Sequence, residues 1–315
     1  MSDLSRRGRE IKEGGQPLVV GISGGKDSMA MALYLIEHKF YETNEIFWCY
    51  TDTKWEHPEI YNYLKEVAEP ELSPYGEFRY LVSEKYPGGM VDMVRDKGFA
   101  SRTARFCTLE LKIKPIKKML KDLREQGHEP INVVGVRAQE SLRRSQMDEF
   151  DIGGPIGVPT WRPLISWLIE EVIEQHQKFG ILPCSLYYKT KNPVKRVGCW
   201  PCLMSSKEEI RGFAEDDPEK VQVIRDLEEE VGEFVQIRPK KSREEKGETH
   251  DPENVLGATF FMASKKPYLR TIDQAIDWAK TARGGIQYQL FTPQNPQEFG
   301  CQLWGLCDMA HEDEG

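Results

Sequence analysis

Residues 18–36 read LVVGISGGKDSMAMALYLI, and this stretch decides the fold. Residues 18–22 are apolar and mostly β-branched, which predicts a buried strand. Residues 29–36 are rich in Ala, Met and Leu, which favours a buried helix. The polar hexapeptide SGGKDS, residues 23–28, joins the two. A strand, a glycine loop and a helix in direct succession are typical of an α/β fold.

The hexapeptide predicts a phosphate-binding loop. Gly24 and Gly25 lack a Cβ, so successive backbone amides can converge on one anion. The following helix adds unpaired amides and the positive end of its dipole. Lys26 supplies a cation, whereas Asp27 would repel a phosphate unless it holds Mg²⁺ beside it. An ordinary capped turn needs neither charged residue. The predicted nucleotide-binding residues of the loop are Ser23, Gly24, Gly25, Lys26, Asp27 and Ser28, of which Lys26 and Asp27 are also catalytic candidates.

Apolar runs at residues 45–51, 78–82 and 131–136 predict three further strands, and amphipathic helices are expected between them and at residues 164–179. Alternating strands and helices predict an α/β fold with a doubly wound parallel sheet. Residues 151–163, with three Gly and three Pro, are expected to form a loop. We expect a nucleotide-binding domain over residues 1–210 and an acidic, mostly helical region over residues 211–315.

Polar residues follow two of these strands, at the sheet edge where ligands of such folds bind. Asp52 can accept from a ribose hydroxyl or an adenine amine, or it can simply cap the next helix. Arg137 and Arg144 can present guanidinium groups to phosphate or sulfate oxygens, and Ser141 can donate from a helix N-terminus. Arginines on a helix also often just face water.

The net charge of −8 argues against a generally basic surface, but residues 95–121 hold nine cations and two acids. This basic stripe suits a polyanionic substrate, and a solvated helix surface is the alternative. Arg105 and Lys112 are its candidate substrate contacts. An odd number of cysteines and the lack of a long apolar run indicate a cytoplasmic protein with no membrane segment.

The loop SGGKDS resembles the PP-loop of ATP pyrophosphatases, which cleave ATP between its α- and β-phosphates. A wider set of motifs is similar to the PAPS reductase (phosphoadenylyl-sulfate reductase) family of the adenine nucleotide α-hydrolase superfamily. These motifs lie between residues 18 and 205 and read TDTKWEHPE, RFCTLELKIKPI, GVRAQESLRR, RPLISWLIEEV and RVGCWPC. The resemblance implies a Rossmann-like nucleotide-binding fold and a reaction that is a reduction, an adenylyl transfer or an insertion of sulfur.

Two departures from the reductases favour cleavage of ATP. The reductases generally have a degraded phosphate loop, whereas Lys26 and Asp27 are both present here. Their C-terminal segment with the attacking thiolate has no match in Gly300–Cys307, so the roles of Cys301 and Cys307 stay open. Lys54 stands where relatives commonly have Gly, which leaves the nucleobase pocket undefined.

The remaining cysteines suggest sulfur chemistry. Cys199 and Cys202 form a C-x-x-C in a basic loop, and the fold would bring Cys107 near them. These segments resemble those that hold a 4Fe–4S cluster in the sulfur-insertion ATPases of DNA phosphorothioation, with Cys184 as a fourth ligand or an open iron. A persulfide or disulfide relay between Cys199 and Cys202, or inert structural cysteines, are the alternatives. The spacing alone gives little support to zinc.

Together these features predict an AMP-forming ATP pyrophosphatase that uses ATP and Mg²⁺. It would adenylate an acceptor, and sulfur delivered through Cys107, Cys199 or Cys202 would displace AMP. The expected partners are a cysteine desulfurase or other sulfur donor, and a nucleic-acid acceptor or subunits of a modification complex. The alternatives are a PAPS or APS reductase, an ATP sulfurylase-like adenylyltransferase, and a nucleotide-binding partner without catalysis.

Overall fold

Six strands form one mostly parallel sheet in the order β3-β2-β1-β4-β6-β5. The computed structural model describes residues 4–101, 104–153, 156–189, 191–237, 260–261 and 271–281. Within the sheet, β5 is antiparallel to β6 and the other neighbours are parallel. The strands are β1 (Leu18–Ile22), β2 (Ile46–Asp52), β3 (Glu77–Val82), β4 (Ile131–Val134), β5 (Phe150–Asp151) and β6 (Thr160–Trp161).

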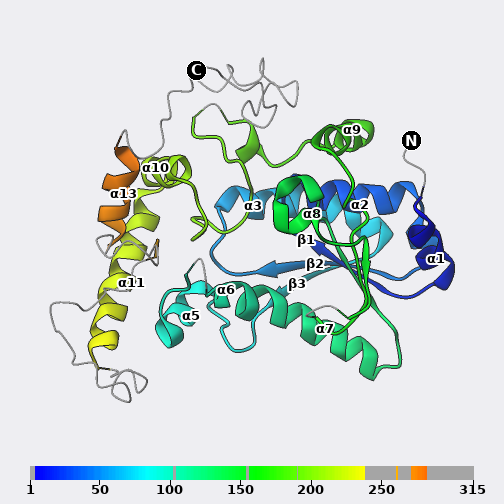
Figure 1. Ribbon diagram of the computed structural model, residues 1–315, viewed down its shortest axis with the longest axis horizontal. Helices are drawn as coiled ribbons and strands as arrows, with labels where there is room; N and C mark the ends of the chain where they lie inside the picture. Colours follow the sequence, from blue (N-terminus) through cyan, green and yellow to red (C-terminus); the bar gives the residue numbers. More distant parts are fainter. Residues whose placement is uncertain are drawn as a thin grey trace. The chain divides into compact units, whose positions relative to one another are not determined.

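Helices cover both faces of this sheet (Figure 1). α2 (Lys26–Glu37) packs on β1 and against α9 (Ile169–Phe179) on one side, and α7 (Lys114–Glu125) contacts β2 and β3 on the other. Under α7, the buried side chains of Val19 and Phe47 meet Leu120. The predicted doubly wound α/β sheet is therefore confirmed. The shorter helices of this part are α1 (Arg6–Gly14), α3 (Pro58–Tyr63), α4 (Glu69–Leu72) and α8 (Leu142–Ser145).

The stretch predicted as a loop, residues 151–163, contains the sheet edge instead. Asn132 of β4 pairs with Thr160 of β6, which pairs in turn with Asp151 of β5. Each of these two strands is only two residues long, so no alternation of apolar residues could reveal it. The helix predicted over residues 164–179 ends as expected at Phe179 but begins only at Ile169. The prediction of a loop holds for most of the described residues of 151–163 and misses only Asp151 and Thr160–Trp161, because long-range pairing rather than local pattern forms these strands.

The contacts between residues divide the chain into two units. The described residues of Met1–Glu84 and Leu111–Cys199 form the first unit, and those of Lys85–Glu110 and Trp200–Asn295 form the second. This differs from the predicted division at residue 210, because a segment between β3 and α7 belongs with the C-terminal helices.

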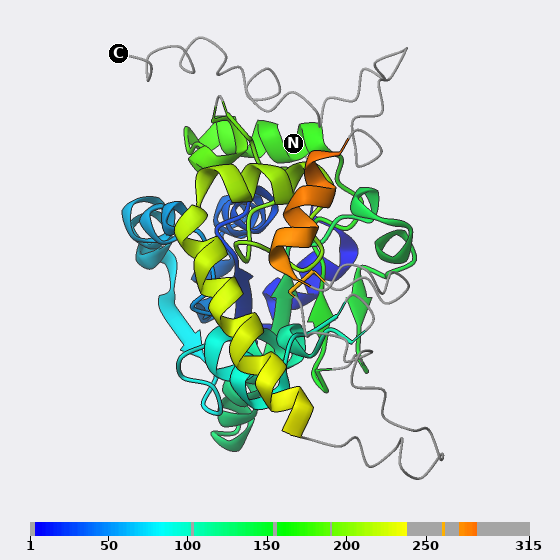
Figure 2. The same ribbon diagram turned by 90° about the vertical axis from the view of Figure 1, so that its left-hand side faces the viewer.

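The second unit consists of α5 (Met90–Lys97), the short α6 (Phe106–Thr108), α10 (Lys207–Asp216), α11 (Pro218–Ile237) and α13 (Ile272–Lys280). Figure 2 shows α13 beside α10 and α11, which it contacts. Buried Glu228 accepts hydrogen bonds from the backbone amides of Phe260 and Ile272 and so joins these segments. Among the described helices of both units, none is long and apolar enough to cross a membrane.

Candidate functional site

The predicted phosphate loop lies between the end of β1 and the start of α2, at the carboxyl edge of the sheet. Gly24 has φ +71°, a backbone conformation that side chains rarely adopt, and a Cβ there would lie 3.0 Å from Cγ2 of Ile60. Ser28 Oγ accepts from the Ser23 amide (3.1 Å) and donates to the Gly25 carbonyl (2.9 Å), which closes the turn. The loop is thus fixed by its two serines, and the first helical amides of α2 follow directly.

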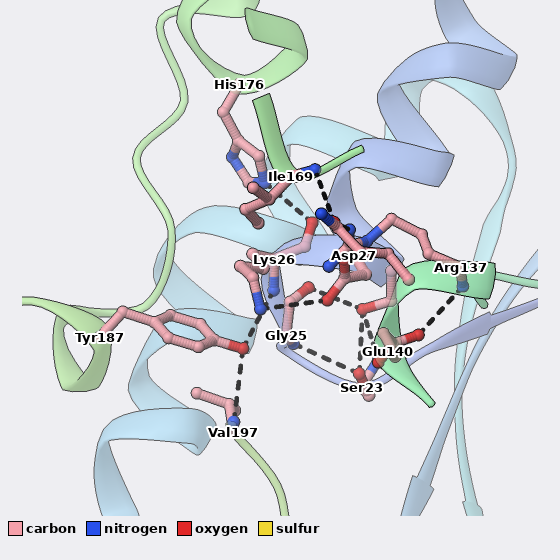
Figure 3. A network of polar contacts seen from close by, with 12 residues as sticks. Ser23, Gly25, Lys26, Asp27, Arg137, Glu140, Ile169, His176, Tyr187 and Val197 are labelled. Carbon is pink, nitrogen blue, oxygen red and sulfur yellow. Dashed lines mark hydrogen bonds and ion pairs between the residues drawn. The ribbon is translucent and has the colours of Figure 1, made fainter. Parts of the chain in front are cut away.

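Two cations meet at Asp27 (Figure 3). The Asp27 carboxylate lies 2.5 Å from Nε of Arg137 and 3.3 Å from Nζ of Lys26. The Arg137 side chain is 2% exposed and that of Asp27 is 16% exposed. The backbones of Gly135, after β4, and Asp27 pack so closely that a Cβ on Gly135 would lie 2.8 Å from the Asp27 carbonyl oxygen. The structure therefore brings together Asp27, which follows β1, and Arg137, which follows β4.

This arrangement keeps the side chains of Asp27 and Lys26 charged. Burial disfavours the charge of Asp27, but the cations of Lys26 and Arg137 outweigh it and lower the pKa of Asp27. Burial likewise disfavours the charge of Lys26, but Tyr187 and Asp27 outweigh it and raise the pKa of Lys26. Two cations beside one carboxylate leave one net positive charge at this end of α2, which favours an anion such as a polyphosphate.

α9 and the segment that follows it contact the start of α2, which the sequence did not predict. The Tyr187 hydroxyl accepts from the Lys26 amide (3.4 Å) and from the Val197 amide (3.3 Å), and Nζ of Lys26 lies 4.9 Å from the centre of the Tyr187 ring. Nε2 of buried His176 lies 2.9 Å from the Lys26 carbonyl oxygen, and its Nδ1 lies 2.9 Å from that of Ile181. These residues, labelled in Figure 3 except Ile181, hold the phosphate loop from outside the motif.

A second chain of contacts supports Arg137 from behind. Gln139 Oε1 accepts from Nη1 of Arg137 (2.7 Å) and from the amide of Ile169, the first residue of α9 (3.0 Å). Glu140 accepts from the Arg137 amide (3.0 Å). The predicted phosphate-binding residue Arg137 is therefore buried and oriented toward Asp27, and its contact with phosphate stays a prediction.

The other predicted contacts of the sheet edge have partners within the chain. Asp52, 5% exposed, accepts from the Lys54 amide (2.8 Å) and the Tyr61 hydroxyl (2.9 Å) and pairs with Nζ of Lys54 (2.6 Å). Ser141 caps α8 by accepting from the Arg144 amide, and Arg144 pairs with Glu140. Asp52 does not cap the next helix, because the N-cap of α3 is His57. Contact with a ligand stays a prediction for Asp52, Ser141 and Arg144.

Most of the basic stripe is paired with carboxylates. Within the first unit, Lys112 lies 3.6 Å from Glu56, and Lys118 lies 2.7 Å from Asp122. Arg105, in the second unit, lies 3.4 Å from the Thr108 hydroxyl. Because the stripe is divided between two units and is largely neutralised, these contacts favour the alternative of a solvated helix surface.

The described cysteines differ in burial. Cys49 and Cys184 are buried, and burial raises the pKa of Cys49 to about 12 and that of Cys184 to about 11. Burial also raises the pKa of Cys107. Cys107 and Cys202 belong to the second unit, whereas Cys184 and Cys199 belong to the first. Cys49 lies in the hydrophobic core under α7, and Cys301 and Cys307 lie outside the described residues.

The cysteines predicted as cluster ligands are divided between the two units, so the iron–sulfur cluster stays a prediction. Among the described residues, no group of three or more His, Cys, Asp and Glu side chains is placed to hold a metal ion. The Sγ of Cys184 instead lies 3.9 Å from the Glu59 carbonyl oxygen in the core. Mg²⁺ fits better, because nucleotide enzymes commonly hold it by one or two carboxylates and by the phosphates themselves. Asp27 supplies one such carboxylate at the start of α2.

The part of the chain that contains this site matches a known protein family. The model of the phosphoadenosine phosphosulfate reductase domain matches residues 17–205, which contain the sheet and the phosphate loop. The chain belongs to the PAPS reductase family. The family consists of PP-loop enzymes, and this chain has the intact PP-loop.

Two related proteins come from phages of Escherichia. The uncharacterized 37.8 kDa protein in the gpa 5′ region of phage 186 is 28% identical, over 92% of this chain and 96% of that protein. The uncharacterized nin region protein ORF290 of phage lambda is 28% identical, over 40% of this chain and 49% of that protein. Their names assign no reaction.

Solved structures of the same general fold are more distant. The PAPS reductase of Candida auris in its phosphate complex has a TM-score of 0.43 and 15% identity, and covers 61% of this chain and 88% of that one. The U34-tRNA thiolase NcsA of Methanococcus maripaludis, solved with its 4Fe–4S cluster, has a TM-score of 0.39 and 14% identity, and covers 82% and 88%. At this level of similarity neither bears on the reaction of this chain.

Proposed function

We propose that the protein is an AMP-forming ATP pyrophosphatase that adenylates an acceptor for sulfur transfer. The observation that carries this proposal is the phosphate loop with both of its charges, Lys26 and Asp27, at the start of α2 and with Arg137 beside them. An enzyme that receives a ready-made activated nucleotide has no need of groups that stabilise departing pyrophosphate. The family membership supports a role connected with sulfur transfer.

The chain's own residues would act on the phosphates. The amides after Gly25 and the ammonium group of Lys26 would bind the β- and γ-phosphates, where negative charge grows as pyrophosphate leaves. The Asp27 carboxylate would hold Mg²⁺, which supplies further neutralisation of that charge when it is bound. The acceptor oxygen would attack the α-phosphorus, so that one P–O bond forms and the bond to pyrophosphate breaks.

Sulfur would then replace the adenylated oxygen. A persulfide carried by a cysteine attacks the activated atom and expels AMP with the bonding electrons, leaving product and protein joined by a disulfide. A second thiol releases the product sulfur, and the resulting protein disulfide is reduced by a cellular dithiol. We propose a nucleic acid as the acceptor and a persulfide-forming enzyme, such as a cysteine desulfurase, as the donor.

Pyrophosphate release from ATP tests this proposal. The full chain is incubated with ATP, Mg²⁺, a sulfur donor and either DNA or tRNA, and the digested nucleosides are analysed for sulfur by mass spectrometry. Lys26→Ala is expected to lose at least ~100-fold in pyrophosphate release. The matched control is Lys121→Ala, which removes an exposed lysine of α7 and should keep wild-type activity. Full pyrophosphate release by Lys26→Ala would overturn the proposal.

A second candidate is reduction of PAPS, because the matching family model is named for that activity. The reductase would be established if the wild-type protein forms sulfite from PAPS and a dithiol, and neither releases pyrophosphate from ATP nor incorporates sulfur.

A further inference from the structure

One cysteine of the chain faces a buried carboxylate. Sγ of Cys199 lies 3.8 Å from Oε1 of Glu56 and 3.8 Å from Oγ1 of Thr53. The backbones of Glu56 and Cys199 also form an antiparallel bridge, which holds the two residues opposite each other. Both belong to the first unit, and Glu56 lies four residues after the end of β2. This contact joins two of the sequence motifs, TDTKWEHPE and RVGCWPC.

Glu56 is held in one orientation. Its residue is 5% exposed. Oε1 accepts from the Thr53 hydroxyl (2.7 Å), and Oε2 accepts from the Trp55 amide (3.2 Å) and the Tyr61 hydroxyl (3.2 Å). Nζ of Lys112 lies 3.6 Å from Oε1. Burying a carboxylate is costly, and these contacts offset that cost. A side chain so fixed against a thiol is suited to receive its proton.

A buried hydroxyl beside this cluster has no partner among the described residues. Tyr50, on β2, is 2% exposed, and its hydroxyl makes no hydrogen bond there. Burial, followed by the charges of Glu56, Tyr61, Asp52 and Cys199, raises the pKa of Tyr50. The ring of Tyr50 also packs edge-on against that of Tyr61 (centroids 6.4 Å apart), whose hydroxyl donates to Glu56. Because buried polar groups are nearly always satisfied, a donor left open by the described residues is available to a bound group.

We propose that Cys199 is the residue that accepts sulfur from the donor, and that Glu56 receives the proton of its thiol. This inference rests on the sulfur-transfer role in the proposed function and selects one cysteine from the three predicted carriers. Thr53 orients the carboxylate, and Lys112 stands beside it. The Tyr50 hydroxyl donates to the incoming sulfur group.

The step is a transfer of sulfane sulfur from a persulfide R–S–SH. Sγ of Cys199 attacks the outer sulfur, a new S–S bond forms, and the S–S bond of the donor breaks with both electrons on R–S⁻. The proton of Cys199 passes to Glu56 and then to the departing thiolate. The products are Cys199–S–SH and R–SH, so no external oxidant or reductant is needed. While the proton is on Glu56, the positive charge of Lys112 faces the sulfur anion, and the net charge of the cluster is unchanged.

Loading with glutathione persulfide tests this role without ATP. The full chain is treated anaerobically, and the sulfur gained by each cysteine-containing peptide is measured by mass spectrometry over time. We expect sulfur on Cys199 in the wild type and none at position 199 in Cys199→Ser. Glu56→Gln keeps the size of the side chain and acceptor capacity, and it should slow loading at least ~10-fold. Glu59→Gln, which replaces a carboxylate three residues along the same segment, should load at the wild-type rate.

A second variant keeps the inference testable if Glu56→Gln does not fold. Tyr50→Phe removes a hydroxyl that has no partner among the described residues, so its Tm should not fall, whereas loading should slow several-fold.

Sulfur found on Cys107 or Cys202 in place of Cys199, or wild-type rates in both Glu56→Gln and Tyr50→Phe, would overturn the inference. Because loading requires no ATP, the two proposals fail separately. An ATP pyrophosphatase that loads another cysteine refutes only this inference, and a chain that loads Cys199 without ever cleaving ATP refutes only the proposed function.

Discussion

Replacing Arg137 with methionine is expected to destabilise the first unit by about 3–5 kcal/mol, because it leaves the mostly buried Asp27 carboxylate without its main partner. The Arg137 side chain is 2% exposed and its Nε lies 2.5 Å from Asp27. With charge centres about 4 Å apart and an effective dielectric constant of about 20, the pair interacts by about 4 kcal/mol. Lys26, at 3.3 Å on the other oxygen, recovers part of this energy.

A double-mutant cycle isolates the pair. The variants are Arg137→Met, Asp27→Asn and the double substitution, and unfolding in urea is followed by tryptophan fluorescence. We expect a coupling energy of about 2–3 kcal/mol. The control cycle uses Lys121 and Glu125 on α7, whose side chains are 74% and 64% exposed, and should give at most about 0.5 kcal/mol. Equal coupling energies in the two cycles would refute the view that Asp27 and Arg137 form one buried unit.

Three further outcomes follow from the site. Gly24→Ala should cost about 1–2 kcal/mol of stability, because the residue is left-handed and its Cβ would press on Ile60. An unchanged Tm would contradict this. Burial lowers the pKa of His176, so the unfolded state binds more protons near pH 6 and stability should fall as pH drops below about 6.5. A flat urea midpoint from pH 7 to 5.5 would count against it. Cys184, with a pKa of about 11, should react with iodoacetamide at pH 7.5 far more slowly than unfolded chain, as followed by peptide mass spectrometry; equal rates would show the thiol to be accessible.

The main sheet could be predicted from the sequence because its strands carry local signals. β1 and β2 are continuous apolar runs, which is typical of strands covered by helices on both faces. β5 and β6 could not be predicted, since two residues carry no periodicity and their pairing depends on β4. The start of α9 was predicted too early for a similar reason, because an apolar pattern continues through the turn at residues 164–167.

The sequence by itself determined the phosphate loop. Two glycines, two serines and a Lys–Asp pair between a strand and a helix are consecutive residues, and their geometry depends mainly on local backbone conformation. Only the tertiary structure decided which distant residues meet that loop. Arg137, His176 and Tyr187 lie 110 to 161 residues from their partners in it, and Cys199 lies 143 residues from Glu56. No local pattern encodes such contacts, because they form only when parallel strands bring their carboxyl ends to one edge and buried polar groups must find partners there.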